Sequence, residues 1–396
     1  MKRERTYLDH NASAPLRPEA LAAMTAALEA VGNASSVHAE GRRARALVDG
    51  AREEVAALVN ARPSEIVFTS GATESNNWVI GAGWDTVLVA GIEHDSVLAP
   101  AAFSPTRCVE LAVSPAGQIA VEAVEQVLAG AGRLGRALIC VQLANNETGV
   151  LQPVAEIAMR ARSTGVRLHT DAVQAVGRIP VDFASLGVDF MSLSSHKLGG
   201  PKGVGALVIR DGLDLLPMMR GGGQERRRRA GTENVAAIAG FGAAAAAAGR
   251  ELRRAARLGE LRSRMEQGVA RLTPQAVVLG AGAPRLPNTS CIALPGTSAA
   301  LSVIKMDLAG VAIGAGSACS SGKLGASHVL AAMGVPAQLM ECAVRVSLGW
   351  NSEESDVDAF LEAWAALSGD QATSKTASPA AAPTRAGRAT HMTAGE

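Results

Sequence analysis

One lysine in the sequence stands where a cofactor could be attached covalently. Lys197 lies in a polar, glycine-bounded turn, Ser194–Gly203, directly after the apolar run Phe190–Leu193. An amine held at a strand end and shielded from water is partly neutral, and a neutral amine can condense with an aldehyde such as that of pyridoxal phosphate. A solvated lysine in a surface turn is the ordinary alternative, so this pattern alone leaves both interpretations open.

A carboxylate at a neighbouring strand end favours the first interpretation. Asp171 follows the short apolar run Val166–Leu168. A carboxylate there could pair with a pyridinium nitrogen and keep it protonated, which makes the ring an electron sink for a carbanion at the alpha carbon of a substrate. We therefore predict that Asp171 and Lys197 belong to one site.

Phosphate donors are expected at the same edge of the sheet. Gly71, Ala72 and Thr73 stand between a predicted strand and a predicted helix, so their N–H groups and the Thr73 hydroxyl could hold a phosphate. An ordinary N-cap is the alternative. Further donors are expected from Ser194, His196 and Thr232.

Three further polar side chains follow strand-like runs. His94 could stack on a flat ring and transfer protons, although a lone histidine is more often structural. Asn146 and Gln174 could hydrogen-bond the phenolic oxygen of such a ring or a substrate, although such amides often bind only loop backbone. Their position at strand ends favours a functional role for all three.

Cys319 and Arg345 carry the remaining chemistry. Among the five cysteines, which show no CxxC spacing typical of structural zinc, Cys319 lies in a run of small residues, Gly314–Gly322, where a thiol is available for reaction. Arg345 lies in a strand-like run, where a guanidinium usually holds a carboxylate through two hydrogen bonds. An internal salt bridge with a glutamate is the alternative for Arg345.

The alternation of apolar runs with alanine-rich helical stretches predicts an α/β fold. Six short runs rich in β-branched residues indicate βαβ units around a mostly parallel sheet. These runs are Ile66–Thr69, Thr86–Ala90, Ala137–Leu143, Val166–His169, Phe190–Leu193 and Val204–Ile209. Ligands bind beyond the carboxyl ends of such strands, and the polar clusters fall there.

The length of 396 residues predicts more than one domain. We expect residues 21–245 to form a large cofactor-binding domain and residues 246–367 a smaller α+β domain that carries Cys319. A long helix from about Gly240 to Leu272 is expected to join them. Residues 1–20 are expected to pack with the small domain. Residues 368–396, which contain few large apolar side chains, are expected to be disordered.

Composition excludes several classes of partner. With 38 basic and 37 acidic residues, the chain has no overall charge that would attract nucleic acid or an anionic membrane. The run Arg226–Arg229 is basic, but aromatic residues make up only 3% of the chain, so a loop that faces a phosphate or a neighbouring subunit is favoured over a nucleic-acid site. No apolar stretch has the length of a signal peptide or a membrane span, so we expect a cytoplasmic protein.

Ten motifs in one order give the sequence a family resemblance, which spans about residues 5–367. They are Tyr7–Ala12, Gly32–His38, Phe68–Asn77, Glu93–His94, Asn145–Glu147, Asp171–Gln174, Ser194–Gly205, Gly221–Asn234, Gly316–Ser321 and Arg345–Gly349. With these motifs the chain resembles the cysteine desulfurases of the NifS and IscS type, which are class V aminotransferases of pyridoxal-phosphate fold type I. It departs at Ala34, where proline is common, and in the basic run Arg226–Arg228.

The resemblance implies a seven-stranded-type sheet flanked by helices and a role for each candidate residue. Lys197 would link pyridoxal 5'-phosphate, His94 would stack on its ring and Asp171 would pair with the ring nitrogen. Gln174 and Asn146 would contact the ring oxygen or the substrate, and Arg345 would hold the substrate carboxylate. The phosphate would be bound by Ala72, Thr73, Ser194, His196 and, from the second subunit of a homodimer, Thr232.

The implied reaction converts L-cysteine to L-alanine. The Lys197 amine would remove the alpha proton, and a Cys319 thiolate would take the substrate sulfur as a persulfide for iron–sulfur or other sulfur-compound biosynthesis. The implied protein partner is a sulfur acceptor such as an iron–sulfur scaffold. Cys319 could also be a transient iron–sulfur ligand. A transaminase or selenocysteine lyase of the same family, and a non-catalytic sulfur-relay subunit, are the alternatives.

Overall fold

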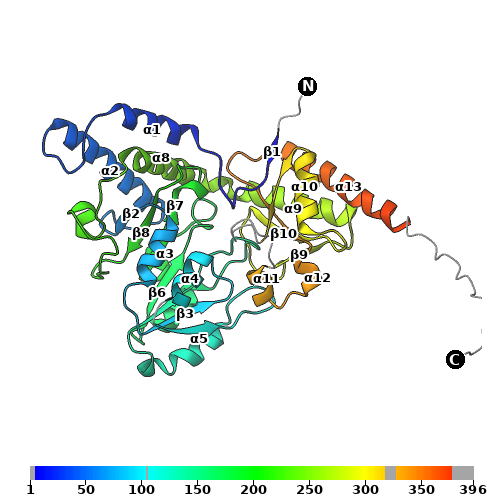
Figure 1. Ribbon diagram of the computed structural model, residues 1–396, viewed down its shortest axis with the longest axis horizontal. Helices are drawn as coiled ribbons and strands as arrows, with labels where there is room; N and C mark the ends of the chain where they lie inside the picture. The colour runs from blue at the N-terminus through cyan, green and yellow to red at the C-terminus, as the bar shows by residue number, and fades with distance from the viewer. Residues whose placement is uncertain (1–4, 104–105, 317–326, 377–396) are drawn as a thin grey trace, which may run out of the picture.

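The computed structural model describes residues 5–103, 106–316 and 327–376, and its largest sheet has seven strands (Figure 1). In spatial order they are β2 (Ile66–Thr69), β8 (Gly205–Ile209), β7 (Phe190–Ser194), β6 (Arg167–Asp171), β5 (Ala137–Cys140), β3 (Thr86–Ala90) and β4 (Arg107–Leu111). Strand β8 runs antiparallel to both neighbours, and the other paired strands are parallel. The prediction of a mostly parallel sheet is confirmed.

The edge strand β4 is missing from the six predicted runs. Its sequence, RCVEL, mixes polar with apolar residues, and most of it is exposed. An edge strand buries little side-chain surface, so its apolar pattern is weak and local sequence does not reveal it.

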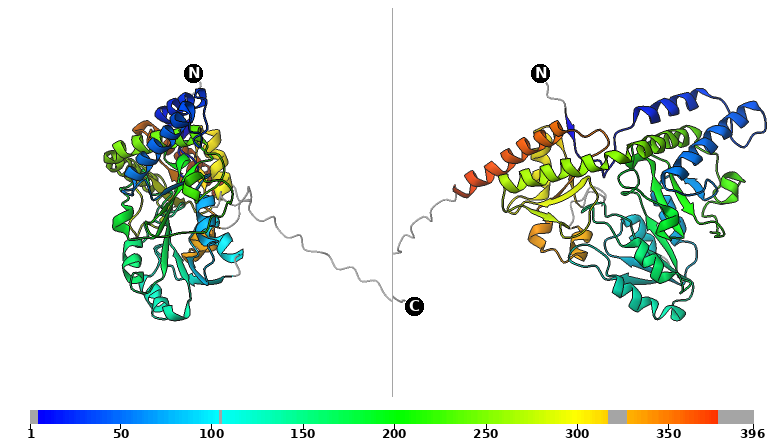
Figure 2. Two further views of the ribbon diagram at one scale, coloured as in Figure 1. Left: turned by 90° about the vertical axis from the view of Figure 1, so that its left-hand side faces the viewer. Right: turned by 180° about the vertical axis from the view of Figure 1, so that it is seen from behind.

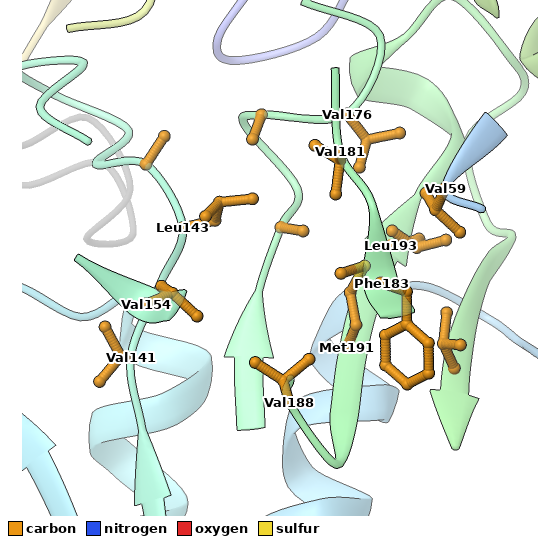
Figure 3. Packing of buried hydrophobic residues seen from close by; sticks show 14 of the residues in the cluster. Val59, Val141, Leu143, Val154, Val176, Val181, Phe183, Val188, Met191 and Leu193 are labelled. Atoms are coloured by element: carbon orange, nitrogen blue, oxygen red, sulfur yellow. The ribbon is translucent and has the colours of Figure 1, made fainter. Parts of the chain in front are cut away.

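Strand residues alternate between two hydrophobic clusters, one on each face of the large sheet. In β3, Leu88 packs into one cluster and Val87 into the other, as successive strand residues must. Figure 3 shows Met191 and Leu193 of β7 on the face that Phe183 also covers. Because both faces are buried, these strands are almost continuously apolar, which is why they could be recognised in the sequence.

Helices cover both faces of this sheet. The alanine-rich helix α8 (Val235–Glu251) packs against α1 (Pro18–Glu29) and α2 (Ala39–Leu58), since its small side chains permit close approach. On the same face lie α5 (Val121–Leu128), α6 (Val154–Ala161) and α7 (Phe183–Leu186), and on the other face lie α3 (Ala72–Ile80) and α4 (Asp95–Phe103).

A four-stranded antiparallel sheet follows in the C-terminal part of the described chain. Its order is β12 (Gly314–Ala315), β13 (Ala343–Ser347), β10 (Thr289–Ala293) and β9 (Val277–Leu279), and near it β1 (Thr6–Tyr7) pairs in parallel with β11 (Val311–Ala312). Its helices are α9 (Ala255–Leu272), α10 (Ala299–Leu308), α11 (His328–Ala332), α12 (Ala337–Met340) and α13 (Glu354–Thr376). Helices α9 and α13 lie side by side (Figure 2), and Trp364 is fully buried in the third hydrophobic cluster.

Two sequence-based expectations about helices are wrong. The single helix expected from about Gly240 to Leu272 is the pair α8 and α9, which meet at 75° across residues 252–254. The bend occurs because α8 buries its apolar residues in the cluster beside the large sheet, whereas α9 buries Leu261 and Met265 beside the small one. Helix α13 also continues to Thr376, into the segment for which disorder is expected, because extending an existing helix is easier than starting a new one.

Among the described residues no single helix is both long and apolar enough to cross a membrane. Taken together, the bent pair α8 and α9 is long and apolar enough by length and composition alone. Buried core helices of other proteins pass the same test.

Candidate functional site

A cavity of about 470 Å³ opens at the carboxyl ends of the large sheet's strands. The sequence-predicted residues that line it are Ala72, Thr73, His94, Asn146, Asp171, Gln174, Ser194, His196 and Lys197. They come from separate strand ends and are brought together by the parallel order of β5, β6 and β7, with α3 and the N-terminal segment alongside. The structure therefore gathers these nine residues around one space.

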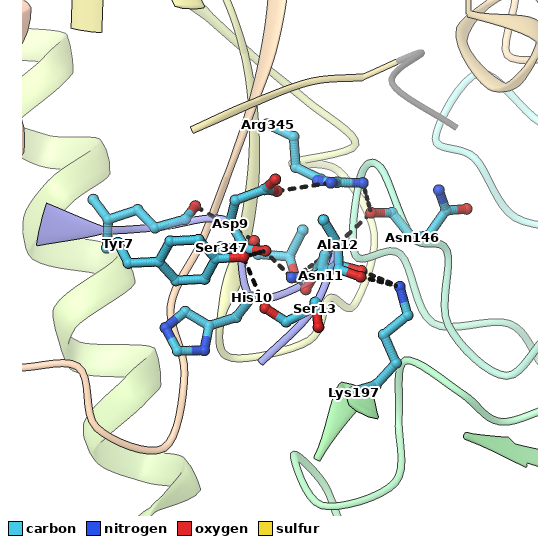
Figure 4. A network of polar contacts seen from close by, with 12 residues as sticks. Tyr7, Asp9, His10, Asn11, Ala12, Ser13, Asn146, Lys197, Arg345 and Ser347 are labelled. Atoms are coloured by element: carbon cyan, nitrogen blue, oxygen red, sulfur yellow. Dashed lines mark hydrogen bonds and ion pairs between the residues drawn. The ribbon is translucent and has the colours of Figure 1, made fainter. Parts of the chain in front are cut away.

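Lys197 lies in the turn that follows β7, and the N-terminal segment holds its amine. Its Nζ donates to the carbonyl oxygens of Asn11 and Ala12, the second at 2.9 Å (Figure 4). The segment is fixed in turn, because the Asn11 side chain donates to Asn146 O and to Thr289 Oγ1, both at 3.0 Å. The lysine is thus partly buried at the cavity wall with its head group aimed at a fixed position.

A chain of hydrogen bonds joins Asp171 to His94. Asp171 Oδ2 accepts from Asn76 Nδ2 at 2.9 Å, and the same amide donates to Ser96 Oγ at 2.9 Å. His94 Nδ1 accepts from the Ser96 N–H at 3.0 Å, so the neutral imidazole carries its proton on Nε2. Asn76 and Ser96 take part in this chain of hydrogen bonds, and the sequence reasoning missed both. Their signals were an amide one turn inside the predicted phosphate-binding helix and a hydroxyl two residues after His94.

Buried Glu93 lies next to this chain of hydrogen bonds. Burial raises its pKa well above the usual range, the N–H of Gln142 lowers it by a hydrogen bond of 2.8 Å to Oε1, and Asp171 raises it further. Its Oε2 has no hydrogen-bond partner in the described part of the chain. Burial therefore favours the neutral form of Glu93 beside Asp171.

The N-terminus of α3 is open to an anion. Gly71 at its N-cap supplies no side-chain cap, and the N–H groups of Ala72 and Thr73 bond to no described residue. Glu74, one turn in, bonds the Ser70 N–H at 2.8 Å and forms a two-pronged ion pair with Arg229 at 3.0 and 3.2 Å. Free N–H groups and the helix dipole favour a phosphate at this point.

His196 and Lys202 line the same cavity as the N-terminus of α3. Burial, followed by the charges of Lys197, Lys202 and Arg178, lowers the pKa of His196 to about 4. His196 is therefore a neutral hydrogen-bonding group near pH 7, while Lys202 contributes positive charge. Together with Ser194 and the α3 N-terminus, the wall fits the phosphate of a planar aldehyde cofactor whose aldehyde would meet Lys197.

Gln174 is held in one orientation by a buried arginine. Arg178 Nη1 donates to Gln174 Oε1, and Gln174 Nε2 donates to Asn11 O at 3.1 Å. Burial, and to a lesser degree Arg345, lowers the pKa of Arg178 to about 9. The amide nitrogen of Gln174 is thus fixed as a donor beside the cavity.

Arg345 lies behind the cavity wall and does not line the cavity itself. It is 1% exposed, and its Nη2 pairs with Asp9 Oδ1 at 2.8 Å while Nη1 donates to Asn146 O at 3.2 Å (Figure 4). The internal salt bridge considered as an alternative exists, with an aspartate in place of the expected glutamate. Its Nε has no partner among the described residues, so the guanidinium has one donor to spare.

Thr232, like Arg345, does not line the cavity, and its side chain is exposed. Cys319 lies outside the described residues. The described chain also contains no cluster of three or more metal-ligating side chains.

Two arginines of the basic run Arg226–Arg229 bond to other parts of the described chain, and one of them forms an ion pair. Besides the Arg229 pair with Glu74, Arg228 donates to Ser64 O at 3.2 Å. The preceding residue, Glu225, is buried and accepts two hydrogen bonds of 2.8 Å from Arg52. These contacts hold the loop against the phosphate-binding edge of the sheet.

Comparisons with known proteins agree with this geometry. The family model described as aminotransferase class V matches residues 6–360. An IscS-like cysteine desulfurase of Mycobacterium tuberculosis is 39% identical over 90% of this chain and 94% of its own length. The crystal structure of a NifS-like protein from Rickettsia africae has a TM-score of 0.85 at 33% identity and covers 92% of this chain and 100% of that one. A structure described as SspA in complex with cysteine has a TM-score of 0.75 at 29% identity and covers 87% of this chain and 98% of that one.

Proposed function

The chain belongs to the class-V aminotransferase family and, within it, to the cysteine desulfurases, and we propose that it uses pyridoxal 5'-phosphate, bound around Lys197, to take sulfur from L-cysteine. One observation carries this proposal: Lys197, Asp171 and the open N-terminus of α3 face a single cavity. A lysine, a carboxylate and an anion site at one strand edge are the groups that this cofactor requires.

Each part of the cofactor has a matching group in the cavity. Lys197 would hold the aldehyde carbon, Asp171 the ring nitrogen, and His94 the ring face. The phosphate would be bound by the N–H groups of Ala72 and Thr73, with Ser194, His196 and a second-subunit Thr232. When bound, the cofactor withdraws electrons from the alpha carbon of an attached amino acid.

Protein groups would orient the substrate and move its proton. The Lys197 amine, once released from the cofactor, is placed to take the alpha proton, since Asn11 and Ala12 fix its position. Arg345 would bind the substrate carboxylate, in exchange for or in addition to Asp9, because its Nε still lacks a partner in the described structure. Asn146 and Gln174 would donate hydrogen bonds to the ring oxygen or to the substrate.

Cys319 would be the nucleophile that accepts sulfur. Its thiolate would attack the sulfur of the bound cysteine, so that an S–S bond forms and the C–S bond breaks with its electron pair kept by carbon. Protonation of that carbon gives alanine, and the enzyme keeps a persulfide. An acceptor protein such as an iron–sulfur scaffold would remove this sulfur, and Cys319 could also be a transient iron–sulfur ligand.

A homodimer would complete the phosphate site. Thr232 is exposed, and several large apolar side chains on α1 and near the basic loop are also exposed, among them Leu28 at 72% and Leu216 at 72%. Exposed apolar side chains of this size favour a second copy of the chain as their partner. Location in the cytoplasm and the division into residues 1–20, 21–245, 246–367 and 368–396 stay predictions.

Mass spectrometry after incubation with L-cysteine tests the proposed function. We expect one added sulfur on the Cys319 peptide and one alanine released for it, and neither in a Cys319→Ala variant. Alanine formation from a keto acid without sulfur transfer would favour a transaminase, and release of selenium from selenocysteine alone would favour a selenocysteine lyase. A colourless protein that carries sulfur without forming alanine would favour a relay subunit.

A further inference from the structure

The carboxylate of Glu147 lies where the chain enters and leaves the segment 317–326. Ser327 Oγ donates a 2.6 Å hydrogen bond to Glu147 Oε2. A β-carbon placed on Gly316 would lie 2.8 Å from the same oxygen, so the backbone of Gly316 packs directly against it. Both described flanks of the segment that contains Cys319 therefore meet at one carboxylate oxygen.

Glu147 belongs to a rigid turn in the cavity wall. It is 2% exposed and follows Asn146, which lines the cavity. Its N–H donates to Asn145 Oδ1 at 2.9 Å, and Asn145 Nδ2 donates to Ile92 O at 3.1 Å. The position of the Glu147 carboxylate is thus coupled to that of Asn146.

A second contact ties the same flank to the other side of the cavity. His328, the residue after Ser327, has Nε2 at 2.9 Å from Glu93 O. Glu93 immediately precedes His94, whose ring lies at the cavity. The C-terminal flank of the segment is therefore attached beside both Asn146 and His94.

We propose that Glu147 and Ser327 are positioning residues for sulfur transfer, which hold both flanks of the Cys319 segment against the cofactor cavity. The proposal rests on the proposed role of Cys319. It adds that Glu147 and Ser327, which lie outside the cavity, affect only the transfer of sulfur. A hydrogen bond between a hydroxyl and a carboxylate is short and strong, and Ser327 Oγ also caps α11 by accepting from Leu330 N at 3.1 Å. The hydroxyl therefore joins α11 to Glu147, and its removal breaks this link while the contact between His328 and Glu93 stays.

The test separates cysteine binding at the cofactor from transfer of its sulfur. In Ser327→Ala holoenzyme, we expect the change in cofactor absorbance on mixing with L-cysteine to keep the parent's rate. Persulfide formation on Cys319 should slow by roughly tenfold to a hundredfold, the usual effect of misplacing a reacting group by about 1 Å. Its rate is measured by quenching the reaction and analysing the protein by mass spectrometry. Ser327→Thr, which keeps the hydroxyl, should restore the parent's rate.

Ser298 offers a matched control. It caps α10 by accepting from Leu301 N at 3.3 Å, as Ser327 caps α11, but it bonds to no carboxylate of the described residues. Ser298→Ala should leave both rates unchanged. Persulfide formation at the parent's rate in Ser327→Ala, or equal slowing of the absorbance change, would overturn the proposal.

Limited trypsin digestion tests the same contact without reference to activity. Lys323 lies in the segment, and we expect cleavage after it to be faster in Ser327→Ala and Gly316→Ala than in the parent and Ser298→Ala. Equal cleavage rates in all four proteins would contradict the proposed clamp. If the parent itself forms no persulfide on Cys319 while these cleavage rates differ as expected, the proposed function fails and the clamp stands.

Discussion

Asn76 donates a 2.9 Å hydrogen bond to the carboxylate of Asp171 from the same helix, α3, whose N-terminus forms the anion site. One short helix therefore positions groups for both ends of the proposed cofactor. Asn76 is fully buried, and loss of its amide would leave Asp171 with the Val173 N–H, at 3.0 Å from Oδ1, as its described donor.

Replacement of Asn76 should weaken cofactor binding. We expect Asn76→Ala to raise the dissociation constant of pyridoxal phosphate by about tenfold or more, as is typical when a hydrogen bond to a buried charged group is lost. Fluorescence titration of the apoprotein with the cofactor measures this. Asn77→Ala is the matched control, because its amide bonds the Thr73 carbonyl and does not reach Asp171. Equal affinities for the Asn76 variant and the parent would contradict the role assigned to this bond.

Loss of the ion pair between Glu74 and Arg229 should weaken binding of pyridoxal phosphate only through its phosphate group. Arg229→Met leaves the negative charge of Glu74 uncompensated beside the anion site. We expect roughly threefold to tenfold weaker binding of pyridoxal phosphate, of the order of a helix-terminus charge effect. Binding of pyridoxal, which lacks the phosphate, should not change. Arg226→Ala in the same loop serves as control, since no described carboxylate pairs with Arg226; equal losses for both ligands would show a general disruption instead.

Acid should remove the stabilisation that Glu266 provides. Although burial opposes it, hydrogen bonds and charge from Arg285, with Ser290 and Arg262, hold the pKa of Glu266 below its ordinary value of 4.5. A lowered folded-state pKa means that the stabilisation is complete above pH 4.5 and is lost as the pH falls through the folded-state value. Glu266→Gln should therefore reduce the free energy of unfolding by about 1.5–3 kcal/mol at pH 7. In urea titrations, the difference in free energy of unfolding between Glu266→Gln and the parent should narrow below pH 4.5. A difference that does not change with pH would refute the stabilising role of the Glu266 carboxylate.

Variants at Lys197 and Cys319 should lose different steps, cofactor attachment in the first and sulfur transfer in the second. Lys197→Ala should lose the visible absorbance of the covalently attached cofactor. Cys319→Ala should stay yellow and respond spectrally to L-cysteine, yet form no persulfide. Should the Cys319 variant release sulfide at the parent's rate, another group would be the nucleophile.

The cavity residues were predictable because most of them stand at the ends of buried strands. Six runs such as Phe190–Leu193 are apolar on both faces, so the strand ends and the polar residues after them, including Lys197, are visible in the sequence. Asn76 gave no such signal, because inside a helix it looks like any surface amide. The bend between α8 and α9 was equally hidden, since each half is a regular helix on its own.

The sequence by itself determined which chemical groups are available and at which strand ends they stand, because strand periodicity and turn residues are local properties. Only the tertiary structure decided which groups meet. Arg345 is paired with Asp9, and Glu147 lies against both Gly316 and Ser327, through contacts between residues far apart in the chain. Such contacts depend on how two sheets and their helices pack, and that packing is set by burial of the whole chain rather than by any local pattern.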